Sequence, residues 1–245
     1  MRNPEEPDRP ELIFALVGAS GVRLDDLAAA LKAQLATFGY RALDIRLSDL
    51  LVNFEGWTDQ TGTGESNRIR HRQDVGNLFR YRLNDGAAIA RAGIVEIRAR
   101  RAAISGSPDH PAPAHAYILH QLKHPDEVEL LRQVYGSSFL LIAGHAPLET
   151  RATELSIRMA RKDDRPGEES HFKADAYLII DIDENQDEDF GQHSRDTYPK
   201  LIFSPIWVLT GESTKCNGLW IFSLDILSEL LHLKSTQCIR PVQYH

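Results

Sequence analysis

The sequence predicts a three-layer α/β domain, in which helices cover both faces of a central parallel sheet. Short, nearly continuous apolar runs alternate with segments whose apolar residues recur at helical spacing. No segment repeats another, and the composition changes near residue 201, after which arginine nearly disappears and both cysteines occur. We therefore expect one domain over residues 11–200 and an irregular C-terminal extension of uncertain origin over residues 201–245.

The first strand is expected at residues 11–18, because an apolar run that ends in glycine is typical of a parallel strand buried on both faces. A helix follows, whose apolar residues lie three and four positions apart and so share one face. These residues are Leu24, Leu27, Leu31, Leu35 and Phe38, and Gly39 suits the left-handed end of the helix. A second strand is expected at residues 40–47, and the polar residues 52–66 are expected to form a loop.

The alternation continues through the rest of the domain. In chain order we expect helices at 73–82 and 85–101, a strand at 116–121, a helix from Pro125, a strand at 138–143, a helix with Leu148, Ala152, Leu155 and Met159 facing the core, and a last strand at 176–180. Pro125 suits a first helical turn, where Asp126 and Glu127 interact favourably with the helix dipole. Within the extension, residues 220–233 have the pattern of an amphipathic helix.

The turn after the first strand carries the main chemical signal. It consists of Gly18, Ala19, Ser20, Gly21, Val22 and Arg23. Glycines let a backbone wrap around a ligand, and the free amide groups at the start of a helix attract anions such as phosphate. The pattern departs from the phosphate-loop consensus G-x-x-x-x-G-K-S/T, because Arg23, Leu24 and Asp25 stand at its last three positions.

Two interpretations of this turn stay open. In the first, it is a degenerate phosphate loop that still binds nucleotide, with Arg23 substituting for the missing lysine. In the second, it is a strand-to-helix turn kept for packing. Asp25 and Asp26 add negative charge where the phosphate would bind. Efficient phosphoryl transfer is therefore disfavoured, because that chemistry depends on placed cations.

Arginines elsewhere form a second group of candidates. Arg151, Glu154, Arg158 and Arg161 are spaced by three, four and three, which places them on one helix face, opposite the apolar stripe. The three arginines would close over a triphosphate like a lid, and the alternative is an exposed face with an internal Arg–Glu pair. Arginines are also frequent over residues 68–101, where most belong to solvated helix faces and one or two would contact a nucleotide.

An acidic run at residues 181–189 resembles a calcium-binding loop only in part, because Gln186 and Gln192 replace the required glycine and glutamate. Asp181 or Asp183, at the end of the last predicted strand, would instead help to hold Mg²⁺. The remaining interpretation is a solvated acidic loop.

Composition argues against several other classes of protein. The net charge of −7 at pH 7 gives no general attraction to nucleic acid or to anionic membranes. The two cysteines, Cys216 and Cys238, match neither a disulfide framework nor a zinc motif. The proline-rich start lacks an apolar signal segment, and no stretch is long and apolar enough to span a bilayer. We therefore expect a soluble, cytoplasmic protein without zinc.

Several of these segments together resemble a known family. They are residues 11–21, 38–40, 45–48, 76–77, 116–136, the helix with Arg151, 191–192 and 195–197, and residues 123–132 are the most specific part. Over residues 11–200 the chain resembles the N-terminal P-loop kinase-like domain of the deoxycytidylate-deaminase-like antiphage proteins, also described as dCTP deaminases. The resemblance implies an atypical phosphate loop in a domain that regulates a C-terminal zinc deaminase, which depletes deoxycytidine nucleotides during phage infection.

The chain departs from this family in its C-terminal part. A zinc deaminase needs a His/Cys-x-Glu element and a Pro-Cys-x-x-Cys element, and Cys216 and Cys238 have neither spacing. We expect no deaminase activity from this chain. We interpret it as a truncated or frame-shifted relative whose residues 201–245 are unrelated to the family.

The sequence therefore predicts a P-loop NTPase or nucleotide-kinase-like domain that binds a nucleoside triphosphate, with Mg²⁺ as a candidate cofactor, and acts as a regulatory or sensor domain. The alternative is an active nucleoside or nucleotide kinase that transfers phosphate from ATP, with Arg23 or Lys123 supplying positive charge. A third is an interaction module that binds no nucleotide. The expected partners are a nucleotide and either a deaminase domain or a second copy of the chain, and no catalytic residue is assigned.

Overall fold

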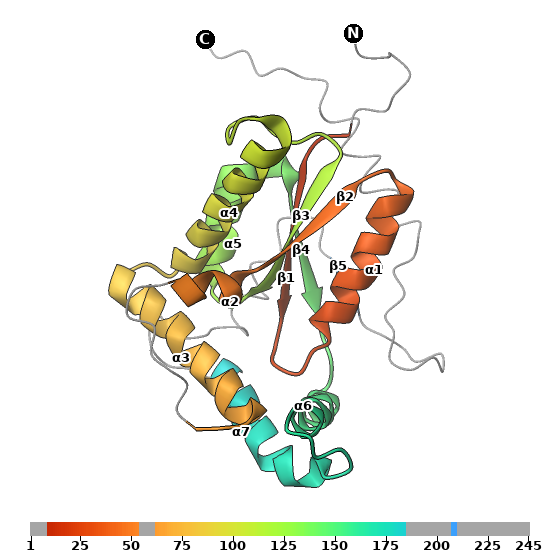
Figure 1. Cartoon of the computed structure of the whole chain (residues 1–245), viewed down its shortest axis with the longest axis vertical. Helices are drawn as coiled ribbons and strands as arrows, with labels where there is room; N and C mark the ends of the chain where they lie inside the picture. The colour runs from red at the N-terminus through yellow and green to blue at the C-terminus, as the bar shows by residue number, and fades with distance from the viewer. Residues whose placement is uncertain (1–8, 54–61, 185–206, 210–245) are drawn as a thin grey trace.

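The computed structural model describes residues 9–53, 62–184 and 207–209 of the chain. Most of the predicted extension, including the helix expected at 220–233, lies outside these residues, as does the acidic run from residue 185 onward. Within them the predicted architecture is confirmed. Five strands form one sheet in the order β2-β3-β1-β4-β5, and each neighbouring pair is parallel. Helices lie on both faces of this sheet (Figure 1).

Four of the strands match predicted ones, and the fifth lies in the predicted extension. The strands are β1 (Leu12–Gly18), β2 (Arg41–Arg46), β3 (His115–Leu122), β4 (Phe139–Gly144) and β5 (Trp207–Leu209). Every residue of β1 is buried, because β3 and β4 flank it and helices cover both of its faces. The central strand is therefore the one that the sequence marks most clearly.

The predicted helices up to residue 162 are confirmed, with bounds that differ by several residues at some ends. The helices are α1 (Leu24–Thr37), α2 (Leu47–Leu50), α3 (Glu65–Leu83), α4 (Ala88–Ser105), α5 (Pro125–Tyr135), α6 (Leu148–Lys162) and α7 (Lys173–Glu184), with 3₁₀ turns η1 (Leu51–Asn53), η2 (Gly136–Ser138) and η3 (Glu169–Phe172). Helix α3 begins inside the segment 52–66, for which the sequence predicts a loop. Leu148, predicted to face the core, is 46% exposed at the first turn of α6.

Alternating side chains of β1 build two apolar cores, one on each face of the sheet. Leu12, Phe14 and Leu16 pack with the apolar stripe of α1. The residues between them, such as Ile13, pack in a second core that includes Ile97 of α4 together with residues of α5. Figure 1 shows α1 on one side of the sheet and α4 and α5 on the other.

The prediction of a last strand at residues 176–180 is wrong, because this segment lies within helix α7. Ala176, Ile179 and Ile180 recur at helical spacing and pack in one cluster with apolar residues of α6. A short apolar run fits a buried strand and a buried helix equally well. The apolar face of α6 is the tertiary contact that favours the helix.

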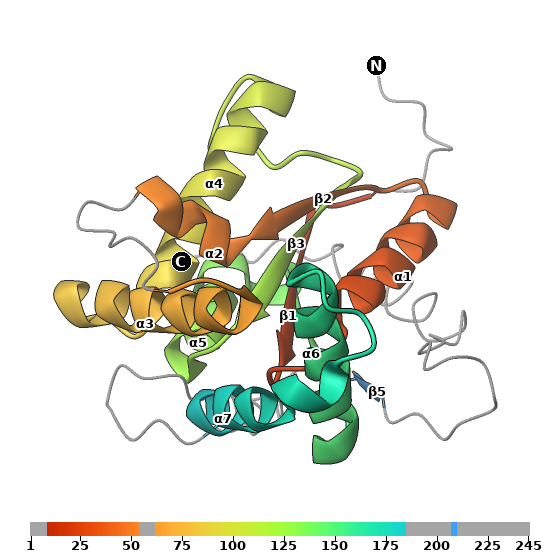
Figure 2. The same cartoon turned by 60° about the horizontal axis from the view of Figure 1, so that its bottom comes forward.

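Helices α3, α6 and α7 gather at the carboxyl end of β1, beside the turn between β1 and α1 (Figure 1 and Figure 2). Helix α6 packs on α7, and α3 contacts both. In open parallel sheets, ligands bind outside the carboxyl ends of the strands. These three helices and the turn therefore surround the candidate site. No helix in the described ranges has the length and apolarity that crossing a membrane requires.

Candidate functional site

The turn between β1 and α1 is a tight loop that depends on glycine and lies against the start of α6. Gly21 has a φ of +89°, a left-handed conformation that other residues rarely adopt. A Cβ atom at this position would lie 2.4 Å from the carbonyl oxygen of Arg151. Inside the loop, the Val22 amide donates to the Ala19 carbonyl at 3.1 Å. Only glycine at position 21 is compatible with this backbone.

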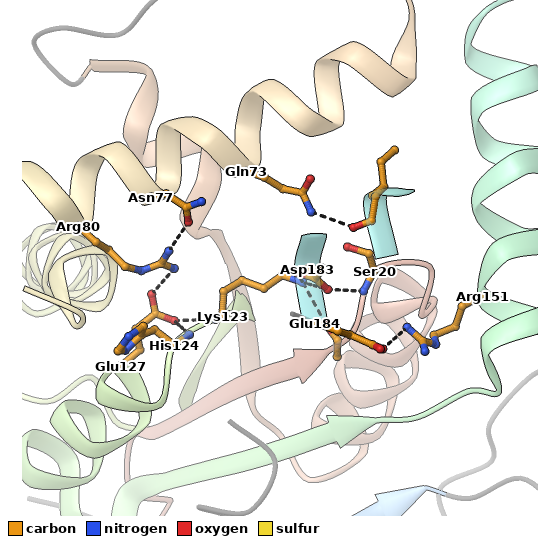
Figure 3. Close-up of polar contacts among 12 residues, drawn as sticks. Ser20, Gln73, Asn77, Arg80, Lys123, His124, Glu127, Arg151, Asp183 and Glu184 are labelled. Atoms are coloured by element: carbon orange, nitrogen blue, oxygen red, sulfur yellow. Dashed lines mark hydrogen bonds and ion pairs between the residues drawn. The ribbon is translucent and has the colours of Figure 1, made fainter. Parts of the chain in front are cut away.

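An internal carboxylate occupies the anion-binding side of the loop. The Ser20 amide donates a hydrogen bond of 2.6 Å to Oδ2 of Asp183, which belongs to α7. The ammonium of Lys123 lies 2.6 Å and 2.8 Å from the two oxygens of this carboxylate, and 3.3 Å from the Gly18 carbonyl oxygen. Asp183 is 0% exposed. Figure 3 shows the carboxylate between the lysine and Ser20. The loop thus binds an anion, and that anion is part of the chain.

Lys123 follows β3 and is positioned by the start of α5. Oε2 of Glu127 accepts hydrogen bonds from the backbone amides of Lys123 at 2.7 Å and of His124 at 3.0 Å. Oε1 of Glu127 pairs with Arg80 of α3 at 3.0 Å, and both side chains are almost fully buried. This buried ion pair therefore fixes the backbone from which Lys123 reaches the loop.

Arg23 does not take the place of the missing phosphate-loop lysine in this structure. Its guanidinium pairs with Asp26 at 2.6 Å, and the side chain is half exposed. Asp25 pairs with Arg46 at 2.7 Å, also at the surface. Arginines thus balance the two carboxylates that the sequence places near the phosphate. Lys123, rather than Arg23, supplies the positive charge beside the Ser20 amide.

Arg151 is buried and does not lie on an exposed helix face, as the predicted lid requires. Its side chain is buried, its Nε donates to the Ala146 carbonyl at 3.1 Å, and its Nη1 lies 2.7 Å from Oε1 of Glu184. The prediction that Arg151 shares an exposed face with Arg158 and Arg161 is therefore wrong, although those two arginines are exposed. Helix α6 turns Arg151 inward because α7 and the loop pack on that side, and Glu184 compensates its charge.

Arg158 lies beside α3, where it shares the carboxylate of Glu65 with Arg68. It lies 3.6 Å from Oε1 of Glu65, and the same carboxylate pairs with Arg68. Half of the Arg158 side chain is exposed, but partial desolvation of its guanidinium and the positive charges of Arg68 and Arg72 lower its pKa. The carboxylates of Glu65 and Asp25 act in the opposite direction. The positive charges of Arg68 and Arg72 therefore act on Arg158, while Glu65 pairs with Arg68 and Arg158, and Asp49 pairs with Arg72 at 3.3 Å.

The predicted Mg²⁺ role of the acidic run starts from a wrong premise, because residues 181–184 are helical rather than the end of a strand. Asp183 pairs with Lys123, and Asp181 lies on the exposed side of α7. Among residues 9–53, 62–184 and 207–209, no group of three or more His, Cys, Asp or Glu side chains is placed to hold a metal ion.

The structure brings Gly21 against the backbone of Arg151, and it places Arg158 beside Glu65 of α3. Sequence reasoning missed Asp183 as a partner of the loop, since no local pattern relates residues so far apart. A signal for Glu127 was available, because it stands three residues after His124, at the position of a capping-box carboxylate.

No family model matches the chain, and no curated protein matches it. Among solved structures, a gluconokinase from Sinorhizobium meliloti 1021 is 9% identical with a TM-score of 0.35, over 94% of each chain. A shikimate kinase from Acinetobacter baumannii in complex with shikimate is 12% identical with a TM-score of 0.37, over 96% of this chain and 97% of that one. At these scores neither similarity supports an inference about function. The comparisons by sequence give no support to the resemblance to the deaminase-like proteins.

Proposed function

We propose that this domain binds the phosphates of a nucleotide at residues 18–23, with Lys123 as their counter-ion. The observation that carries the proposal is the carboxylate of Asp183, which the Ser20 amide and the Lys123 ammonium hold at the carboxyl end of β1. Carboxylate and phosphate oxygens accept hydrogen bonds from the same donors. Helix N-termini and the carboxyl ends of parallel strands are both common phosphate sites.

Positive charge beyond the loop supports a ligand with more than one phosphate. Arg158 feels the positive charges of Arg68 and Arg72 and the negative charge of Asp25 in the first turn of α1, and Glu65 and Asp49 compensate part of the positive charge. A nucleoside triphosphate with Mg²⁺, extending from the loop toward these arginines, would fit this charge pattern. The predicted contribution of Arg158 to phosphate binding is therefore kept in the proposal, and Arg151 is given the supporting role of shaping the loop.

The regulatory role rests on the sequence resemblance alone. Because of this resemblance, dCTP is the first nucleotide to test beside ATP. The first partners to test are a deaminase domain and a second copy of the chain. The division of the chain at residue 200 and the cytoplasmic location likewise stay predictions from the sequence.

A nucleoside or nucleotide kinase that uses ATP is a second candidate, and the position of Lys123 favours it. The loop lacks its own lysine, but the ammonium of Lys123 lies 3.3 Å from the Gly18 carbonyl oxygen. Phosphoryl transfer depends chiefly on cations placed around the transferred group. Release of ADP that requires an added acceptor nucleoside or nucleotide would favour this candidate over a binding domain.

Isothermal titration calorimetry of the full chain with ATP and with dCTP, each with Mg²⁺, tests the proposal. Gly21→Asp is expected to abolish the heat of binding, because its Cβ would lie 2.4 Å from the Arg151 carbonyl oxygen. Gly167→Asp is the matched control, since Gly167 has a φ of +91° but nothing within 4 Å of its Cβ position. Equal affinities for the two variants would contradict the proposal. So would the absence of heat at millimolar nucleotide in the wild type and in an Asp183→Asn variant alike.

A further inference from the structure

Asp183 fills the place that the proposed function gives to a phosphate. Its carboxylate accepts the Ser20 amide at 2.6 Å, and its two oxygens lie 2.6 Å and 2.8 Å from the Lys123 ammonium. A backbone amide carries one hydrogen, so the Ser20 amide cannot donate fully to Asp183 and to a phosphate at once. The side chain is also fully buried and occupies space that the ligand needs. The two anions therefore exclude each other.

We infer that Asp183 is an internal competitor for phosphate, and that ligand binding releases the last turn of α7 from the loop. The inference rests on the proposed function, because it concerns the regulation of the same site. The ligand class is a nucleotide polyphosphate, whose oxygens take over the Ser20 amide and the Lys123 ammonium. The apparent affinity is then the intrinsic affinity reduced by the fraction of molecules in which Asp183 has left the loop.

A second carboxylate ties the same turn of α7 to the loop. Glu184 pairs with Arg151 at 2.7 Å, and the Arg151 carbonyl oxygen is the atom that a Cβ at Gly21 would meet. Figure 3 shows these two contacts of α7, one through Ser20 and one through Arg151. A ligand that displaces Asp183 therefore also disturbs the pair between Glu184 and Arg151.

The earlier turns of α7 are anchored without help from the loop. Ala176, Ile179 and Ile180 pack in the apolar cluster with α6. The Gln73 side chain donates to the Ile179 carbonyl at 3.3 Å and so joins α7 to α3. Because these contacts do not involve the loop, the rearrangement is confined to residues 181–184.

Removing the competing charge tests the inference. Asp183→Asn keeps the shape of the side chain but weakens its hold on Lys123. We expect this variant to bind ATP and inorganic tripolyphosphate about tenfold more tightly than the wild type in calorimetry. Asp181→Asn is the matched control, because it removes the same charge from the exposed side of the same helix. It is expected to change the affinity by less than about twofold, since exposed charges are screened by solvent and salt.

Hydrogen exchange of the wild-type chain gives a test that needs no substitution and no assumption about how a variant folds. With saturating ATP, we expect amides of residues 181–184 to exchange faster and those of residues 19–24 to exchange more slowly. Residues 176–180 should be unchanged, because their anchors are independent of the loop.

The outcomes separate the inference from the proposed function. If the wild type binds these ligands and Asp183→Asn binds them equally or more weakly, the inference is overturned but the proposed function stands. The inference is also overturned if ATP slows exchange in residues 19–24 but does not speed exchange in residues 181–184. If neither the wild type nor Asp183→Asn binds any of these ligands, the proposed function fails and the inference fails with it.

Discussion

Replacing Glu127 with glutamine is expected to destabilise the folded domain by about 3 kcal/mol, because the change leaves the charge of Arg80 buried without a charged partner. The two side chains lie 3.0 Å apart and are only 2% and 1% exposed. Glu127 also accepts the backbone amides of Lys123 and His124. Glutamine fills nearly the same volume and keeps one carbonyl oxygen for these amides. The substitution therefore removes mainly the charge.

The magnitude follows from which contacts survive. Removing one partner of a buried ion pair costs about 3–5 kcal/mol, most of it from the desolvated charge that is left behind. Arg80 keeps a contact of 3.3 Å with Oδ1 of Asn77, so we take the lower end of this range. The double variant Arg80→Met with Glu127→Gln is expected to recover most of the loss, because it leaves no buried charge and glutamine keeps an acceptor oxygen for the amides of Lys123 and His124.

Urea unfolding measures the effect as a shift of the midpoint at constant slope. Glu129→Gln is the matched control, because Glu129 is exposed on the same helix, and its effect should stay below about 0.5 kcal/mol. A loss in Glu127→Gln no larger than that of the control would refute the argument. A double variant less stable than the single one would also contradict it.

Lys123→Met is expected to weaken nucleotide binding by about tenfold or more, because it removes the charge that faces the loop. Lys173→Met, at an exposed position of α7, is the control and should leave the affinity unchanged. Equal dissociation constants for the two variants in calorimetry would exclude Lys123 as the counter-ion. Burial raises the pKa of Tyr135 to about 12 from 10.0, so the folded state favours the neutral hydroxyl. The contribution of this group to the free energy of unfolding is therefore complete below pH 10.0 and is lost as the pH rises through about 12. Tyr135→Phe should flatten the fall of unfolding free energy over this interval, and an unchanged slope in urea unfolding would show that the hydroxyl is not responsible. The purified chain is expected to release no ammonia from dCTP or dCMP, since Cys216 and Cys238 lack the deaminase spacing, and release above that of a heat-inactivated sample would overturn this expectation.

Strand β1 and helix α1 illustrate what local pattern predicts well. A strand that is covered on both faces must be apolar at successive positions, so residues 11–18 stand out in the sequence. A helix that packs on one side of a sheet needs one apolar stripe, and the predicted stripe of α1 is buried at Leu24, Leu27, Leu31 and Leu35. The loop between them follows from these two elements and from its glycines.

Residues 176–180 and Arg151 illustrate where local pattern fails. The apolar run is too short to distinguish a strand from a helix, and its packing on α6 favours the helix. The spacing of Arg151 places it on the polar face of α6, but α7 covers that part of the helix and provides Glu184 as a partner. When a helix is packed against on several sides, its single apolar stripe does not identify all of its buried residues.

By itself, the sequence determined the parallel α/β architecture, the place of the loop after the first strand and its dependence on glycine. These properties depend on residues that are close together in the chain. Only the tertiary structure decided which charges face the loop. Ser20 and Asp183 are 163 residues apart, and Lys123 reaches them from the end of another strand. Their meeting depends on how α7 packs against α6 and α3, and no local periodicity encodes such a long-range contact.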